Sequence, residues 1–139
     1  MTDLKTFHWP ARIYYEDTDA SGVVYHANYL RYFERCRTEW LRAIGFSQEK
    51  LKNELAIAFT IADLSVKYLV PARLDDEIEI RLSVAHVGRA SLRFAQSIRR
   101  VADDATLATG EFRAACVDMR GFKPCAVPPA VLKEIQRAC

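Results

Sequence analysis

The chain has 139 residues, of which 50% are hydrophobic and 27% are charged, with a formal net charge of +2 at pH 7. This length predicts a single domain over residues 1–139, and the scattered, nearly balanced charge argues against nucleic acid as a partner. The polar start MTDLKTFHW contains no signal-peptide core, and no apolar run approaches the ~20 residues that cross a bilayer. We therefore expect a cytoplasmic protein without a transmembrane segment.

The first predicted elements are a strand, a polar turn and a long helix. Residues 7–15 are rich in aromatic and branched side chains, which favours a strand, and a polar turn over residues 17–22 follows. Apolar side chains then recur at helical spacing from 29 to 44. We expect Asn28 to cap this helix and Gly45 to end it.

The second half of the chain changes to strand periodicity. The polar segment 47–54 has room for one or two further helical turns, after which apolar side chains alternate from residue 56 onwards. The alternation changes parity between Ile61 and Leu64, which predicts a bulge or bend in one long strand. Further strands are predicted over residues 78–84, 92–98 and 106–119, joined by turns at 71–76, 88–89 and 103–104.

Two features complete the predicted architecture. Gln96 occupies a position where the strand pattern favours an apolar side chain, and the pair Pro128-Pro129 opens a short C-terminal helix. Consecutive strands joined by tight turns favour an antiparallel sheet, and the long helix has to bury its wide apolar stripe. The predicted class is therefore α+β, with a five-stranded antiparallel sheet wrapped around a long central helix.

The four cysteines show no C-x-x-C spacing, so we expect free thiols in a cytosolic protein. They are Cys36, Cys116, Cys125 and Cys139. Cys36 falls on the apolar stripe of the helix and is interpreted as a core residue, not as a nucleophile.

The segment YYEDTDASGVVYHANY, residues 14–29, concentrates the chemistry of the chain. Asp17 and Asp19 lie in the polar turn, and His26 follows just before the helix. A helix N-terminus presents free backbone N–H groups and a positive dipole end, which suit a developing oxyanion. A carboxylate and an imidazole at this place therefore indicate a catalytic site.

Three simpler interpretations compete with catalysis. Asp17, Asp19, Ser21 and Gly22 match the opening of an EF-hand loop, but Asn28 stands where a bidentate Glu is needed, and a strand precedes the loop instead of a helix. The same residues are also good turn formers without any function. The two aspartates and His26 could supply three mixed ligands for zinc, but no second histidine is close in the sequence, because His8 and His86 lie far along the chain, so we expect no metal.

The segment YYEDTDASGVVYHANYLRYFERCRTEW resembles the signature of the hot-dog-fold acyl-CoA thioesterases. It is most similar to the YbgC, or Tol-Pal-associated, group, which is related to the 4-hydroxybenzoyl-CoA thioesterases. The stretches FHWPARIYYED, VKYLVPARLDDEIEI and CVDMRGFKPCAVP also resemble that group. The resemblance implies a hot-dog fold and hydrolysis of acyl-CoA or acyl-carrier-protein thioesters without a cofactor.

The resemblance also implies roles for individual residues. Asp19 matches the catalytic aspartate, as general base or as nucleophile, and His26 matches the histidine whose backbone N–H polarises the thioester. Tyr15 matches a tyrosine that orients the aspartate or closes the acyl pocket. Asp17 and Gly22 are expected to shape the loop.

The resemblance identifies substrate-binding positions less specifically than catalytic ones. Phe59 and Ile61 are expected to line the acyl pocket, and Arg89 matches a position for the phosphates of the coenzyme, although an exposed turn arginine explains it equally well. Glu34 and Glu39 lie off the apolar stripe of the helix, so we rank them below Asp19 as the catalytic carboxylate. The identity of the acyl group stays open.

The sequence also allows predictions of the assembly and of an alternative function. An isolated hot-dog unit leaves sheet edges exposed, which favours a homodimer, and the family commonly doubles this into a homotetramer. Peripheral association with the inner membrane is compatible with the family. The alternative function is a non-catalytic acyl-thioester or acyl-carrier-protein binding module, or a scaffold in lipid metabolism.

Overall fold

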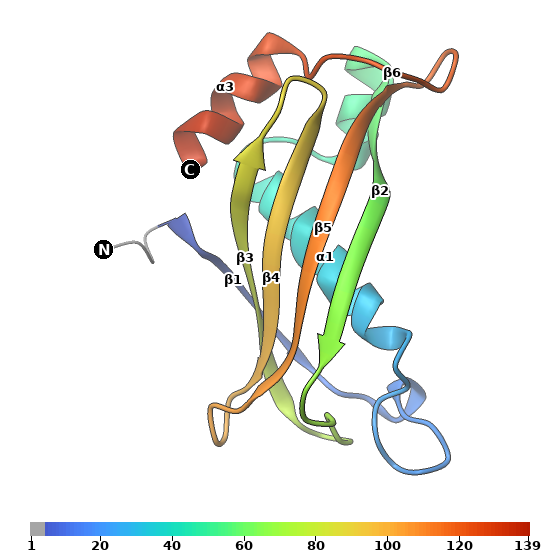
Figure 1. The fold of residues 1–139 in the computed structure, drawn as a ribbon, viewed down its shortest axis with the longest axis vertical. Helices are drawn as coiled ribbons and strands as arrows, with labels where there is room; N and C mark the ends of the chain where they lie inside the picture. The colour runs from blue at the N-terminus through green and yellow to red at the C-terminus, as the bar shows by residue number, and fades with distance from the viewer. Residues whose placement is uncertain (1–4) are drawn as a thin grey trace.

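An antiparallel sheet lies against one long helix in this protein, for which a computed structural model describes residues 5–139 (Figure 1). The first four residues of the polar N-terminal stretch lie outside the described range. The strands are β1 (Phe7–Arg12), β2 (Ile57–Tyr68), β3 (Glu77–Val87), β4 (Ser91–Arg100), β5 (Thr106–Asp118) and β6 (Lys123–Pro124). The helical elements are the 3₁₀ turn η2 (Tyr15–Asp17), α1 (Asn28–Ala43), α2 (Gln48–Lys50), the π-helical turn η3 (Leu51–Leu55) and α3 (Pro129–Ala138).

The order of strands in the sheet is β1-β3-β4-β5-β2, and β6 pairs with β5 outside this path. The strand that follows α1 along the chain, β2, therefore lies at the far edge of the sheet, beside β5 (Figure 1). The pairing of β2 with β5 shifts register between Ile61 and Asp63. This shift confirms the bulge that the change in side-chain alternation predicts.

The core forms where the apolar stripe of α1 meets one face of the sheet. Phe33 of α1 packs on Phe112 of β5 with ring centroids 5.1 Å apart, and Trp40 packs on Phe94 of β4 at 5.3 Å. Each large apolar side chain buried in this way stabilises the fold by about 1.5–3 kcal/mol. The stripe of α1 is thereby fixed on the sheet, and its first turn projects towards the loop that precedes it.

Most of the predicted elements are confirmed. The α+β class, the antiparallel sheet and the helix hold, Gly45 ends the helix region with a φ of 104°, and segment 47–54 is helical. The two-residue strand β6 was not predicted, because a strand of that length has no periodicity to detect. A proline-led C-terminal helix is also present, and it buries Val131 and Ile135.

Two predictions at the start of the chain are wrong. The strand predicted over 7–15 ends at Arg12, because the carboxylate of Asp17 accepts the backbone N–H of Tyr14 at 2.8 Å and turns the chain into the 3₁₀ turn. Asn28 does not cap α1 but is its first residue, after Ala27 at the cap position. Its side-chain amide instead donates to the carbonyl of Asp17 at 2.9 Å.

Candidate active site

The loop between η2 and α1 is anchored on the segment that follows β2. Isolated bridges pair Thr18 with Val24 and Val23 with Arg73. The backbone N–H of Val24 also donates to the carbonyl of Ala72 at 2.9 Å. The polar turn of the sequence is therefore a folded hairpin-like loop in which both aspartates have defined positions.

Asp17 holds this loop from inside. Only 8% of Asp17 is exposed, and its Oδ2 accepts hydrogen bonds from the Tyr14 backbone N–H at 2.8 Å and from the Tyr32 hydroxyl at 2.5 Å. Burial raises the pKa of Tyr32 strongly, and the hydrogen bond to the Asp17 carboxylate raises it further, so the hydroxyl stays a donor. The contacts of Asp17 are those of a loop-supporting residue.

Asp19 is exposed at the tip of the loop. Its Oδ1 accepts the backbone N–H of Ser21 at 2.8 Å and the Ser21 hydroxyl at 2.5 Å. The hydrogen bond from that hydroxyl, followed by the one from the backbone, lowers the pKa of the carboxyl. Gly22 follows with a φ of 83°, a left-handed conformation that glycine adopts without strain. Asp19 therefore carries its negative charge throughout the neutral range.

His26 lies two residues before the first residue of α1 and is exposed. Within residues 5–139, the backbone N–H groups of His26 and Ala27 donate to no acceptor. The carbonyl of His26 accepts the Tyr68 hydroxyl at 2.9 Å, and the two rings meet edge-on with centroids 6.2 Å apart. The end of β2 thus fixes the start of α1, where two free N–H donors lie ahead of the helix.

A mostly apolar hollow of about 200 Å³ adjoins this helix start. It is lined by Val24, His26, Tyr29, Tyr68, Leu69, Val70 and Pro71. Several of these apolar side chains are unusually accessible, with Leu69 exposed to 56% and Tyr68 to 48%. The surface beside His26 is therefore suited to an apolar group.

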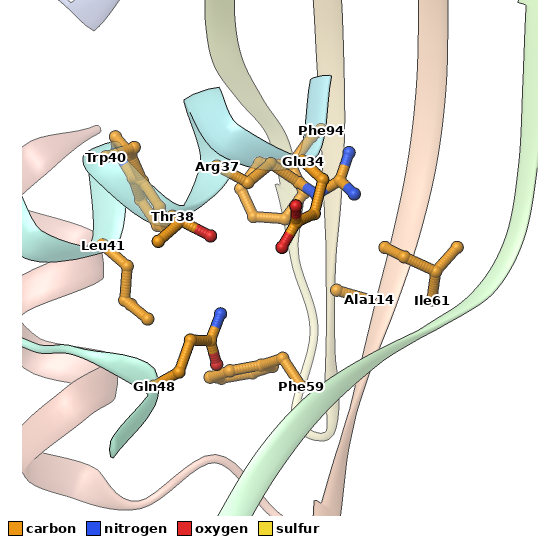
Figure 2. A pocket seen from close by; sticks show the side chains of 10 residues that line it. All are labelled: Glu34, Arg37, Thr38, Trp40, Leu41, Gln48, Phe59, Ile61, Phe94 and Ala114. Atoms are coloured by element: carbon orange, nitrogen blue, oxygen red, sulfur yellow. The ribbon is translucent and has the colours of Figure 1, made fainter. Parts of the chain in front are cut away.

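A second pocket, of about 110 Å³, lies further along α1 between the helix and β2 (Figure 2). Both predicted pocket residues, Phe59 and Ile61, line it. The remaining lining residues are Glu34, Arg37, Thr38, Trp40, Leu41, Gln48, Phe94 and Ala114. In Figure 2 the carboxylate of Glu34, the hydroxyl of Thr38 and the amide of Gln48 point into the space between these side chains.

Arg37 gives this pocket a cation that is held by two neutral groups, the Gln96 amide and the Phe112 ring. Its Nη1 donates to Oε1 of Gln96 at 2.9 Å, and its guanidinium carbon lies 4.4 Å from the centroid of the Phe112 ring. Burial lowers the pKa of Arg37 to about 10, while the charge of Glu34 acts in the opposite direction. Gln96 in turn donates to the carbonyl of Phe33 at 3.0 Å, which explains why the β4 pattern tolerates a polar side chain.

The structure does not bring all the predicted site residues together. Tyr15 is 82% exposed, and within the described chain no hydrogen bond joins its hydroxyl to Asp19. Arg89 lies in the turn that follows β3, at the end of that strand opposite the Asp19 loop (Figure 1). Eleven strand residues separate the two ends, which corresponds to roughly 35 Å. Arg89 of one protomer therefore cannot reach Asp19 of the same protomer.

The structure also bears on a metal site, on reactive cysteines and on a membrane-spanning helix. The two aspartates have separate partners, Tyr32 for Asp17 and Ser21 for Asp19, and among residues 5–139 no group of three metal-ligating side chains is found. Burial raises the pKa of both Cys36 and Cys116 to about 12, which keeps these thiols protonated. No helix in the described range is long and apolar enough to cross a membrane.

Comparison with known proteins agrees with the fold and shows the family. Residues 14–135 match the family model of the Thioesterase-like superfamily. An acyl-CoA thioester hydrolase, YbgC, from Escherichia coli is 44% identical over 131 residues, which cover 94% of this chain and 96% of that protein. The acyl-CoA thioesterase YbgC of Haemophilus influenzae is 44% identical over 125 residues, or 90% of each chain.

A solved structure leads to the same class. The probable thioesterase from Bartonella henselae superposes with a TM-score of 0.83 at 31% identity, over 88% of this chain and 99% of that one. The helix-wrapping sheet and the matched sequence define a hot-dog thioesterase. Within that class, the chain belongs to the YbgC family.

Proposed function

We propose that this protein hydrolyses acyl-CoA thioesters to a free acid and a thiol, with Asp19 acting on the thioester carbonyl or on the attacking water. The observation that carries the proposal is the loop ahead of α1. It combines an ionised carboxylate at Asp19 with the backbone N–H groups of His26 and Ala27, which donate to no acceptor within residues 5–139. Membership in the YbgC family supports the same reaction class.

The start of α1 would polarise the thioester carbonyl. The thioester oxygen would accept the backbone N–H of His26, at the positive end of the α1 dipole. A donor of this kind is worth about 2.7–4 kcal/mol of the barrier. The exposed imidazole of His26 would stabilise the departing thiolate or orient water.

Asp19 would act by one of two routes. As a general base it would take a proton from water while the hydroxide forms a bond to the carbonyl carbon and the thiolate leaves. As a nucleophile it would form a mixed anhydride that water then opens. A single turnover in ¹⁸O-water tests the second route: label in the enzyme identifies an anhydride opened at the Asp19 carbonyl, whereas direct attack of water on the thioester leaves the enzyme unlabelled and places the label in the acid.

The acyl group would extend from the helix start along α1. Glu34 is six residues beyond Asn28, so a chain from the thioester carbon would run ~9 Å along the helix before it meets the pocket of Phe59 and Ile61. The hollow beside Tyr68 lies nearer to His26 and would take a shorter or flatter group. Tyr15 would close the loop from the solvent side when substrate is present.

We also infer a homodimer, or a homotetramer built from two such dimers. In the described protomer β2 pairs with β5 alone, so its outer edge offers backbone groups to another strand. Apolar side chains accompany that edge, with Ile61 exposed to 38% and Leu64 to 45%. A phosphate-binding role for Arg89 would require Arg89 to come from a second copy. Light scattering at assay concentration that gives a monomer mass would contradict shared sites.

The role of Asp19 is tested by replacing Asp19 with Asn. We expect kcat for acyl-CoA to fall by about 10²–10⁴-fold with the fold intact, because the charge and the basic oxygen are lost. Asp103→Asn is a matched control, since Asp103 is also an exposed turn aspartate whose Oδ1 accepts the N–H of the second residue after it. Full thiol release by the Asp19 variant would refute the assignment.

The substrate is tested with a panel of acyl-CoA and acyl-carrier-protein thioesters of short aliphatic, long aliphatic and aromatic acids. Thiol release from at least one class of thioester is expected. Tight binding without release across the whole panel would instead favour a non-catalytic binding module. A cytoplasmic location, with or without peripheral contact to the inner membrane, stays a prediction.

A further inference from the structure

We infer that Ser21 is the positioning residue for Asp19: both of its donors hold Oδ1 of Asp19, so that Oδ2 is the oxygen presented to the substrate or to water. The inference rests on the proposed role of Asp19 and extends it to a second side chain. Within residues 5–139 the hydrogen bonds of the Ser21 N–H and hydroxyl both go to Asp19, so its contribution would act through that carboxylate.

The geometry of the loop tip supports this division between the two oxygens. The Ser21 backbone N–H lies 2.8 Å from Oδ1 and the Ser21 hydroxyl lies 2.5 Å from the same atom. The backbone of Asp19 is also fixed on both sides, because its N–H donates to the carbonyl of Val23 at 2.9 Å and its carbonyl accepts the N–H of Gly22 at 3.0 Å. The exposed carboxylate is therefore restrained at its backbone and at one of its two oxygens.

The side-chain hydroxyl adds what a common aspartate turn lacks. Any residue other than proline at position 21 could donate its backbone N–H to Asp19, whereas the Ser21 hydroxyl adds a second donor to the same oxygen. Hydrogen bonds from a hydroxyl to a carboxylate are short and about twice as strong as neutral ones. Without the hydroxyl, the solvent-exposed carboxylate would rotate into other orientations in which neither oxygen faces the substrate, and the time spent in a reactive geometry would fall.

The protonation behaviour of Asp19 provides an independent readout. The Ser21 hydroxyl is the largest contribution to the lowered pKa of Asp19, so its removal should raise that pKa. A more basic carboxylate would be a better general base if orientation did not matter. A loss of turnover together with a raised pKa would therefore identify orientation as the contribution of Ser21.

The experiment compares Ser21→Ala and Ser21→Thr with the wild-type enzyme. For Ser21→Ala we expect kcat to fall by about tenfold with little change in KM. The ¹³C signal of the Asp19 carboxyl should titrate at higher pH than in the wild type. Ser21→Thr keeps a hydroxyl and should restore both values. Ser83→Ala, which removes a hydroxyl paired with Thr6 in the sheet, should change neither.

Two outcomes would overturn the inference, and they differ from failure of the proposed function. If Asp19→Asn is inactive while Ser21→Ala keeps the wild-type kcat, Ser21 does not position the carboxylate. If the Asp19 titration is unchanged in Ser21→Ala, the hydroxyl is not bound to Oδ1 in solution. If Asp19→Asn is itself fully active, the proposed function fails, and the catalytic role of Ser21 fails with it.

Discussion

The hydroxyl of Tyr32 donates a 2.5 Å hydrogen bond to Oδ2 of Asp17, and this bond joins the second turn of α1 to the loop that precedes the helix. Both residues are buried, Tyr32 to 3% and Asp17 to 8% exposure. The same carboxylate oxygen also accepts the backbone N–H of Tyr14. The loop that carries Asp19 is therefore positioned from the interior of the protein.

Tyr32→Phe should lower the free energy of unfolding by about 1.5–3 kcal/mol, the usual value for a hydrogen bond to a charged group. The ring stays in place, so the loss comes from a buried carboxylate with one donor fewer. Urea denaturation measures the change. Tyr25→Phe, at an exposed tyrosine of the same loop, is the control and should lie close to the wild type. Equal stability of Tyr32→Phe and wild type would contradict the importance of the bond.

Gln96→Leu should destabilise the protein and weaken substrate binding together. The leucine cannot replace the acceptor for Arg37 or the donor to the Phe33 carbonyl, and an unsatisfied buried group costs about 1–3 kcal/mol. Because Arg37 lines the pocket, its release should also raise KM for acyl-CoA. Thermal unfolding and steady-state kinetics measure the two effects. Gln136→Leu on the exposed side of α3 should leave both unchanged.

Gly22→Ala and Gly110→Ala should destabilise to a similar degree but differ in activity. Alanine at position 22 meets no atom within 4 Å, so its cost is the left-handed backbone, about 1–2 kcal/mol. Alanine at position 110 would place its Cβ 2.6 Å from Cε2 of Phe112, an overpacking that costs roughly 1–3 kcal/mol. Only the change at 22 disturbs the turn of Asp19, so only Gly22→Ala should lose kcat at a temperature where both variants are folded.

Glu79 should control part of the stability at acid pH. Its burial acts to raise the pKa, but hydrogen bonds from Arg81, His8 and Arg99 outweigh burial and lower the pKa to about 2, from 4.5 for a free glutamate. A lowered pKa in the folded state stabilises above pH 4.5, and this contribution is lost as the pH falls from 4.5 towards 2. The free energy of unfolding of Glu79→Gln should therefore vary less with pH in this window.

The matched control for that titration is Glu111→Gln, at an exposed position of β5. Its pH profile should run parallel to the wild type. The informative quantity is the difference between each variant and the wild type, because other acidic groups also titrate at acid pH. A wild-type profile as flat as that of Glu79→Gln would show that the cation cluster does not lower the pKa in solution.

Local periodicity was sufficient to predict most of the fold. The apolar stripe of α1 is set by helical spacing alone, and the change in parity between Ile61 and Leu64 requires the register shift that the structure contains. The end of β1 was wrong because it depends on Asp17, whose carboxylate is held by Tyr32 fifteen residues later. A contact between distant residues cannot be detected in the periodicity of apolar residues in either segment.

The candidate site was only partly predictable for the same reason. Asp17, Asp19 and His26 lie close together in the sequence, so their joint presence on the loop could be expected. Glu34 and Gln48 were not predicted as pocket residues, because Glu34 lies off the apolar stripe of α1 and Gln48 lies in a polar segment. Such side chains are expected to face solvent until β2 is placed beside them. Gln96 did show a signal, as a polar residue in an apolar pattern, but its partner Arg37 lies on another element.

The order of strands has a consequence for synthesis of the protein. The neighbour of β2 in the sheet is β5, so a growing chain carries β2 without that neighbour until residues 106–118 have been made. Because the Tyr68 hydroxyl at the end of β2 donates to the carbonyl of His26, we expect the start of α1 to reach its final position only after this distant pairing. During translation, the segment that carries Asp19 is made early, and we expect it to become competent only when nearly the whole chain has emerged.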